Sequence, residues 1–428
     1  NTDDATHRTT LVNLRGAGIY SQVFAGGKGR LVTQCANAKQ LGAIYGNTKL
    51  LIDRPRITYP YWTEAGGFEN PSSDKNMEHP NADINTTMLP LLMEKIYGGC
   101  QNGTVYGNTF VTIYDGRIGH GIYGGGLGSC DTLSVDKEEK VVITSADVKG
   151  NTNVYIKGGQ AMLTSYWLAD TRSWEPAFID EKTGITYSPQ YNHQALKFKI
   201  NHNIYAGGNV ACVVGKDAYL TMEKGLLHDS TQVAYGVNKK FFETMAWKEI
   251  YNKVGSPHFC VFGGGYGEHT VIQGDTHVKI NMEENNNRGH VDDIKKGEEY
   301  KHFLSGFSVM DIVGGGYSGK VVGNTHVEGS GGIFCRRVFG GGFYNSVKST
   351  TVNIKAIDCH DIFGGGMMGD VIDSTAVNIG NPSAQNSNKA IFIHGNVYGG
   401  NDVSGYVNVS VKDGVFTDNN GSGTHINI

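Results

Sequence analysis

The chain has 428 residues, of which 61 are glycine and nine are proline, and only 18% are charged. Glycine at about twice its usual share argues against a mostly helical protein, because a glycine inside a helix costs about 1 kcal/mol relative to alanine. The net charge is −4 and Lys and Arg form no dense block, which gives no indication of a nucleic-acid partner. The sequence contains no apolar run long enough to predict a membrane span.

A short motif recurs along the chain. It consists of an apolar residue, then an aromatic or apolar residue, and then glycines. Its copies are Val23–Gly27, Ile96–Gly99, Ile122–Gly126, Ile204–Gly208, Val261–Gly265, Ile312–Gly316, Val338–Gly342, Ile362–Gly366 and Val397–Gly400. The first and fourth copies are weaker, since alanine replaces one glycine. Clean neighbouring copies are 24 to 26 residues apart. This regular spacing indicates a repeat architecture.

A second motif follows the first by about ten residues and begins with Gly-Asn-Thr or a close variant. Its copies are Gly46–Leu50, Gly107–Ile113, Gly150–Ile156, Gly274–Ile280 and Gly323–Val327. The alternation Thr-x-Val-x-Ile predicts a half-buried strand, and Gly-Asn before it is turn chemistry. Asn at the same place in successive repeats is expected to form a hydrogen-bonded ladder.

Together the motifs predict coils of about 24–26 residues that bury their apolar side only by stacking on one another. The pattern resembles the right-handed parallel β-helix of pectate-lyase-like enzymes and, more closely, the glycine-rich β-solenoids of secreted or surface proteins from gut-type bacteria. The resemblance covers residues 96–126 and 261–413 well, and 20–52 and 148–210 loosely. It implies an all-β, right-handed parallel β-helix and an extracellular location, but it does not imply an activity.

We predict one solenoid domain over residues 1–428 with inserted segments. The insertions are placed at about 53–95, 160–200, 216–258 and 283–302. The third contains the one convincing amphipathic helix, Lys239–Lys253. The chain starts at Asn1 without a signal peptide, and we interpret it as a processed mature protein or a segment of a longer one.

Large aromatic residues gather in the first two insertions, and four of them are candidate glycan-binding residues. These are Trp62, Trp167, Trp174 and Tyr187. Exposed indole and phenol rings can serve as platforms for sugar rings. The alternative, which we favour, is that these side chains hold the inserted loops against the solenoid body.

A column of charged residues appears when the later coils are aligned. Asp311, Arg337 and Asp361 should be vertical neighbours of alternating sign, as in a solvated salt-bridge ladder. The functional alternative is a polysaccharide site, in which Arg336 or Arg337 binds a uronate and His360 or a lysine abstracts a proton. Asp361 belongs to the same candidate catalytic group.

Two further columns have alternative interpretations. Cys335 and Cys359 should stack within disulfide reach, or should lie as two buried thiols, which we favour. The aromatic residues of the first motif should stack in the core, or should form an outward stripe. The seven cysteines lack CxxC spacing and the glycine repeats lack the regular Asp of calcium-binding repeats, so we expect no metal and no cofactor.

These features predict a secreted or cell-surface β-solenoid that binds glycans or acts as an adhesin or structural segment. The expected partner is a polysaccharide or a host glycan, and self-association through the solenoid ends is possible because an uncapped end exposes strand edges. The alternative function is a polysaccharide lyase or another polysaccharide-degrading enzyme with a site along one face.

Overall fold

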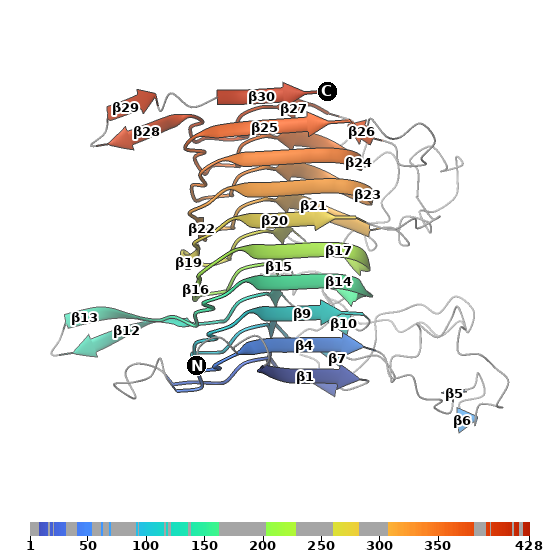
Figure 1. Ribbon diagram of the computed structural model, residues 1–428, viewed down its shortest axis with the longest axis vertical. Coiled ribbons are helices and arrows are strands. Elements are labelled where there is room, and N and C mark those ends of the chain that lie inside the picture. Colours follow the sequence, from blue (N-terminus) through green and yellow to red (C-terminus); the bar gives the residue numbers. More distant parts are fainter. Residues whose placement is uncertain are drawn as a thin grey trace, which may run out of the picture.

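The computed structural model is an all-β parallel solenoid in which strands of successive coils lie above one another (Figure 1). It describes residues 8–15, 18–19, 21–30, 41–53, 61–62, 68–69, 91–92, 94–114, 117–118, 121–135, 138–161, 203–227, 260–281, 307–380, 391–393, 395–412, 415–418 and 423–428. These residues contain no helix, and therefore none that could cross a membrane. The helix predicted at 239–253 lies outside them. The all-β solenoid prediction is confirmed.

One face of the solenoid is a stack of parallel strands built from the Gly-Asn-Thr motif, which we call the threonine stack. Its strands are β1 (Thr9–Arg15), β4 (Asn47–Asp53), β9 (Thr109–Ile113), β14 (Thr152–Ala161), β17 (Ala218–Leu227), β20 (Thr276–Ile280), β23 (Thr325–Phe339), β24 (Thr350–Phe363), β25 (Ser374–Ile379) and β30 (Gly423–Asn427). Burial alternates along β20 with Thr276, Val278 and Ile280 inside. The predicted half-buried strand is therefore confirmed.

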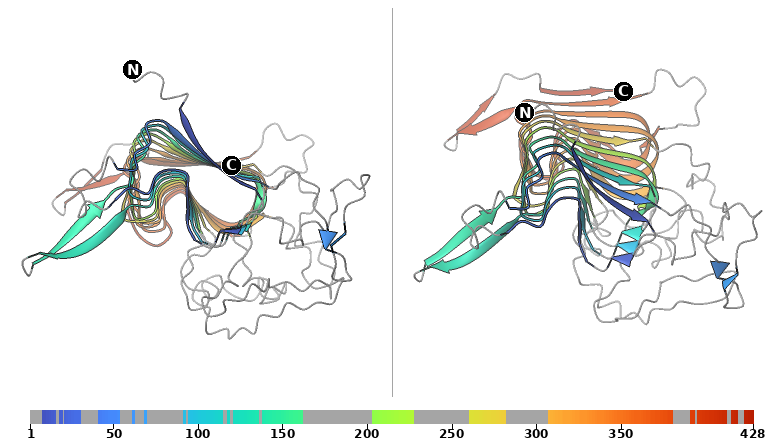
Figure 2. Two further views of the ribbon diagram at one scale, coloured as in Figure 1. Left: turned by 90° about the horizontal axis from the view of Figure 1, so that it is seen from below. Right: turned by 60° about the horizontal axis from the view of Figure 1, so that its bottom comes forward.

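A second stack is built from the first motif, and smaller stacks complete each coil. The second stack contains β3 (Val23–Phe24), β8 (Ile96–Tyr97), β11 (Ile122–Tyr123), β15 (Ile204–Tyr205), β18 (Val261–Phe262), β21 (Phe307–Val313), β23, β24 and β27 (Val397–Tyr398). One smaller stack contains β16 (Ala211–Val214), β19 (His269–Ile272) and β22 (Lys320–Val321). Another contains β2 (Gly18–Ile19), β7 (Leu91–Leu92) and β10 (Arg117–Ile118). The short strand β26 (Ile391–Ile393) pairs with β24. Seen along the axis, the coils nearly superimpose (Figure 2).

The two residues of the first motif face opposite sides of their strand and enter two different cores. Ile96 and its equivalents lie in the main core inside the coil, whereas Tyr97 and its equivalents form a second core. Phe343 and Met367, from the turns after the glycines, pack in this second core. The aromatic rings stack between coils with centroids 4.6 to 5.0 Å apart. Core stacking is confirmed, although Tyr398 in the last coil of this stack is 43% exposed.

The middle glycine of the first motif is required by close approach of the coils. A Cβ atom on Gly315 would lie 2.7 Å from the Cα of Gly342 in the next coil. The Gly315 N–H donates to the Gly341 carbonyl at 3.0 Å, and its own carbonyl accepts from Gly264 at 2.9 Å. Because backbone meets backbone on both sides, no side chain fits at this corner.

Buried threonine hydroxyls join the two large stacks. Each donates to the carbonyl of the first glycine in the following coil at 2.5–2.6 Å. These threonines are Thr48, Thr109, Thr276, Thr325, Thr350 and Thr375. The hydrogen bonds satisfy hydroxyls that are otherwise removed from water, so the threonine is a structural part of the repeat.

The predicted asparagine ladder is present in two forms. In the first, the side-chain Oδ1 of each residue accepts the backbone N–H of the next at 2.7–3.1 Å, ending at Asn324. The accepting residues are Asn47, Asn108, Asn151, Asp217 and Asp275. In the second, the side-chain amides of Asn353, Asn378 and Asn427 bond directly to one another at 2.7–2.8 Å.

The coils reach further into the predicted insertions than the sequence indicated. β7 lies inside the 53–95 segment and β17 inside the 216–258 segment, yet both pair with neighbouring coils. Two antiparallel hairpins were not predicted, β12 (Ser129–Val135) with β13 (Glu138–Thr144), and β28 (Val409–Lys412) with β29 (Val415–Asp418). Both project from the same side of the solenoid in Figure 1.

Candidate functional site

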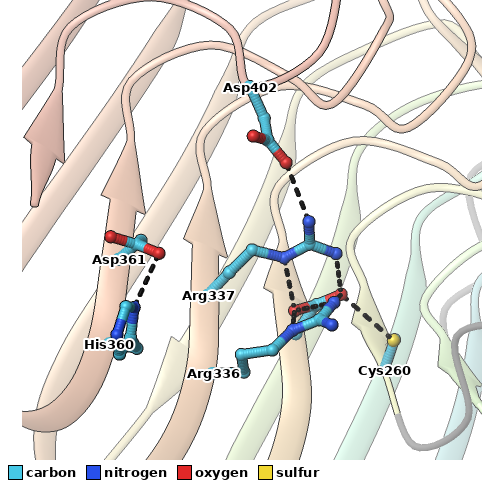
Figure 3. Close-up of polar contacts among 7 residues, drawn as sticks. Cys260, Arg336, Arg337, His360, Asp361 and Asp402 are labelled. Carbon is cyan, nitrogen blue, oxygen red and sulfur yellow. Dashed lines mark hydrogen bonds and ion pairs between the residues drawn. The ribbon is translucent and has the colours of Figure 1, made fainter. Parts of the chain in front are cut away.

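The charged column predicted from the sequence exists, but Asp311 at its start is fully buried and Asp361 at its end is partly solvated. Asp311, Arg337 and Asp361 are register neighbours on β21, β23 and β24. The Asp311 carboxylate is fully buried and accepts hydrogen bonds at 2.7–3.2 Å from both Arg336 and Arg337 (Figure 3). Arg337 also pairs with Asp402 at 2.8 Å. Two guanidinium groups therefore converge on one carboxylate.

The electrostatics of this cluster follow from burial and from these contacts. Burial of Asp311 by itself disfavours its charge, but the two guanidinium groups outweigh this effect and hold its pKa below the usual value. The neighbouring Cys260 thiol lies 3.9 Å from the carboxylate, and burial together with the Asp311 charge raises the thiol's pKa well above normal. The side chains of Arg336 and Arg337 are only 4% and 12% exposed. Their N–H groups donate hydrogen bonds to the protein's own carboxylates, Asp311 and Asp402.

His360 and Asp361 form a separate pair on β24. The imidazole Nδ1 lies 2.7 Å from an Asp361 carboxylate oxygen, and the other oxygen accepts the Asn396 N–H at 2.8 Å. The two side chains are 29% and 18% exposed. A carboxylate that orients a partly exposed imidazole is an arrangement used for proton transfer, so the candidate catalytic residues separate into a buried arginine pair and an accessible His–Asp pair.

The remaining predictions have different outcomes. Cys335 and Cys359 are register neighbours, and both are buried thiols that no disulfide joins. Trp62 lies on β5 (Tyr61–Trp62), which pairs with β6 (Phe68–Glu69), but the structure does not describe its side chain. The residues Trp167, Trp174 and Tyr187 lie outside the described ranges, so their role in glycan binding stays a prediction.

The structure reveals a second candidate site on the outer face of the threonine stack, which we call the outer depression. It has a volume of about 360 Å³ and spans strands of four successive coils. The lining residues are Thr9, Lys49, Phe110, Thr112, Tyr114, Tyr155 and Lys157. Register places Lys49 beside Phe110 and Thr112 beside Tyr155 on adjacent coils. Three aromatic rings and two ammonium groups thus gather on a face that the solenoid core does not use.

A row of stacked rings continues along the same outward column. Tyr219, His277 and His326 occupy successive coils, with ring centroids 4.6 and 4.9 Å apart. Burial lowers the pKa of His277, and the adjacent His326 lowers it further. Asp275 lies 3.7 Å from the His326 imidazole. This row is a partly shielded continuation of the face that carries the depression.

Sequence reasoning missed the outer depression although a usable signal was present. The x positions of Thr-x-Val-x-Ile must face outward, and they hold Lys49, Phe110, Tyr155, Tyr219 and His277. Large aromatic and basic residues at such positions are the unusual feature.

No protein-family model, no curated protein and no solved structure matches this chain. Within the described ranges, no cluster of three or more His, Cys, Asp or Glu side chains is arranged to hold a metal ion.

Proposed function

We propose that the protein binds glycans through the outer depression, as a secreted or cell-surface solenoid. The observation that carries this proposal is the set of Phe110, Tyr114 and Tyr155 around one shallow concavity on a regular sheet face. Tyr114 is 46% exposed. Sugar rings present apolar C–H faces that pack on aromatic rings, and their hydroxyl groups bond to polar side chains at the edges. Aromatic rings and polar side chains both line this depression.

The positions of the arginines support binding over cleavage as the main activity. A lyase needs a cation that reaches the substrate carboxylate, yet Arg336 and Arg337 are buried against Asp311. Releasing them would leave Asp311 without its partners, which is costly inside a protein. The outer depression requires no such rearrangement because its side chains already line a concave surface.

Alanine substitutions in the depression should weaken glycan binding. Tyr155→Ala or Phe110→Ala removes an apolar surface for the sugar, and we expect affinity to fall about tenfold, equivalent to about 1.4 kcal/mol. The measurement is glycan-array screening followed by titration calorimetry with the best oligosaccharide. Tyr344→Ala is the matched control, because Tyr344 is 44% exposed but does not line the depression. Equal losses in all three variants, or no array binding by the native chain, would contradict the proposal.

The pair of His360 and Asp361 favours polysaccharide lysis as a second candidate function. If His360 abstracts the C5 proton of a uronate, the C4–O bond to the neighbouring sugar breaks, a C4=C5 double bond forms and the leaving oxygen takes a proton from water. The native protein should then generate the ultraviolet absorbance of an unsaturated uronate from pectin, alginate or glycosaminoglycans. His360→Gln should lower that rate by about 100-fold or more, in the range typical of general-base removal, whereas Tyr155→Ala should leave the reaction step intact. Flat absorbance traces with all three polysaccharides would eliminate this function.

A further inference from the structure

We propose that the outer depression selects an acidic oligosaccharide, whose carboxylate or sulfate groups pair with Lys49 and Lys157. This inference rests on the proposed glycan-binding function and specifies its ligand class. It concerns the charge of the ligand and its direction on the sheet face, which the aromatic rings alone do not define.

The charged side chains that line the depression are positive. Among the described residues that line it there are two lysines and no aspartate or glutamate. Further along the same outer face a carboxylate stands among the lysines, since Lys279 and Lys355 share Glu328 at 3.7 and 3.5 Å. Among the described residues, the side chains that line the depression therefore contribute only positive charge to it.

Among the described residues, Glu223 is the acidic neighbour of the Lys157 ammonium, and the strength of this ion pair follows from its distance and exposure. The nearest carboxylate oxygen of Glu223 is 3.9 Å away, and the two side chains are 39% and 41% exposed. Exposed pairs at this separation contribute little, because water and salt screen them. Lys157 can therefore turn toward an anionic ligand without losing a strong interaction.

The coil geometry gives the direction of the ligand. Lys49 lies on β4 and Lys157 on β14, with β9 between them in parallel register. Two strand spacings place these coils about 10 Å apart along the axis, and Lys157 lies four residues, about 13 Å, further along its strand than Asn153, the residue in register with Lys49. One spacing is comparable to the length of a pyranose residue in an extended chain. The line between the two lysines therefore crosses the strands obliquely, and the depression fits an extended chain that lies along this diagonal with acidic groups several sugar residues apart, and not a single acidic sugar.

Titration calorimetry of the full chain with three hexasaccharides tests this inference. The probes are oligogalacturonate, which carries carboxylates, a sulfated galactan fragment without uronate, and neutral xylohexaose. We expect an acidic probe to bind most tightly and its affinity to fall with added salt. Lys49→Ala and Lys157→Ala should each weaken it up to about fivefold, and the double variant about tenfold or more. Monomeric galacturonate should bind much more weakly than the hexamer.

The outcomes separate the inference from the function on which it rests. Binding of the carboxylate probe, the sulfate probe or both, with loss in the double variant, supports the inference and identifies the acidic group. Lys279→Ala is the control and should leave affinity unchanged, and unfolding midpoints verify that all variants are folded. Equal binding of xylohexaose, insensitive to both lysines but sensitive to Tyr155→Ala, would overturn the acidic ligand and leave glycan binding intact. Binding of no glycan at all would overturn both.

Discussion

Gly315→Ala should lower the denaturant midpoint of unfolding, whereas Gly400→Ala should leave it unchanged or slightly raised. The two glycines occupy the same place in the first motif, so the substitution is identical in chemistry and position. At Gly315 the new methyl group would lie 2.7 and 2.8 Å from the Cα and N atoms of Gly342. At Gly400 a Cβ atom would meet nothing within 4 Å.

The expected loss of stability in Gly315→Ala follows from the position of the atoms that obstruct the new methyl group. The obstructing atoms belong to backbone, which cannot rotate away as a side chain can, so the two coils must separate. Separation strains the hydrogen bond from the Gly315 N–H to the Gly341 carbonyl. Overpacking of this kind costs on the order of 1–3 kcal/mol. At Gly400 the lower entropy of the unfolded alanine chain favours folding by about 0.4–1 kcal/mol.

Circular dichroism during urea unfolding measures both variants against the native chain. An unchanged midpoint for Gly315→Ala would show that the corner can relax and that close stacking does not require glycine there. An equal fall in both variants would instead assign the effect to the intrinsic preference of glycine for this backbone conformation. Only the asymmetric result follows from the contact between coils.

The same contact explains why the fold could be predicted from sequence. Where another coil is stacked closely on this corner, its backbone excludes any side chain, so glycine recurs at a regular interval. The Thr-x-Val-x-Ile alternation then identifies the strand that follows. The hairpins were not predicted because their signal is local. Ser129–Val135 and Glu138–Thr144 form two antiparallel strands within what the repeat pattern suggested was a simple gap.

The functional surfaces were harder to predict because they depend on register across long gaps. Lys49 and Tyr155 line one depression although 106 residues separate them in the chain. The inserted segments between coils change the spacing, so the motif alone does not reveal which outward side chains become neighbours. Alignment of the later, clean coils did place Asp311 beside Arg337 correctly. It did not reveal that Arg336 contacts the same carboxylate or that Asp402 completes the cluster, since neither follows from a vertical column.

Asp311→Asn should be the most destabilising isosteric substitution in the charged column, and Asp361→Asn is its matched control. The Asp311 side chain has no exposed area and forms ion pairs with two guanidinium groups. Removing its charge leaves Arg336 buried beside a neutral amide, and breaking a buried ion pair from one side costs about 3–5 kcal/mol. Asp361 is partly exposed, and an asparagine there can still accept the Asn396 N–H. We expect that variant to lose about 1 kcal/mol.

The pH dependence distinguishes a charge effect from a packing effect. Because the pKa of Asp311 is lower in the folded chain than its unfolded value of about 3.9, its stabilisation is complete above that value. It is lost as the pH falls through the folded-state pKa. The difference in unfolding free energy between the native chain and Asp311→Asn should therefore stay constant from neutral pH to about pH 4 and shrink below it. A difference that persists unchanged at lower pH would assign the loss to altered packing, and a difference near zero at neutral pH would show that the two arginines do not depend on this carboxylate.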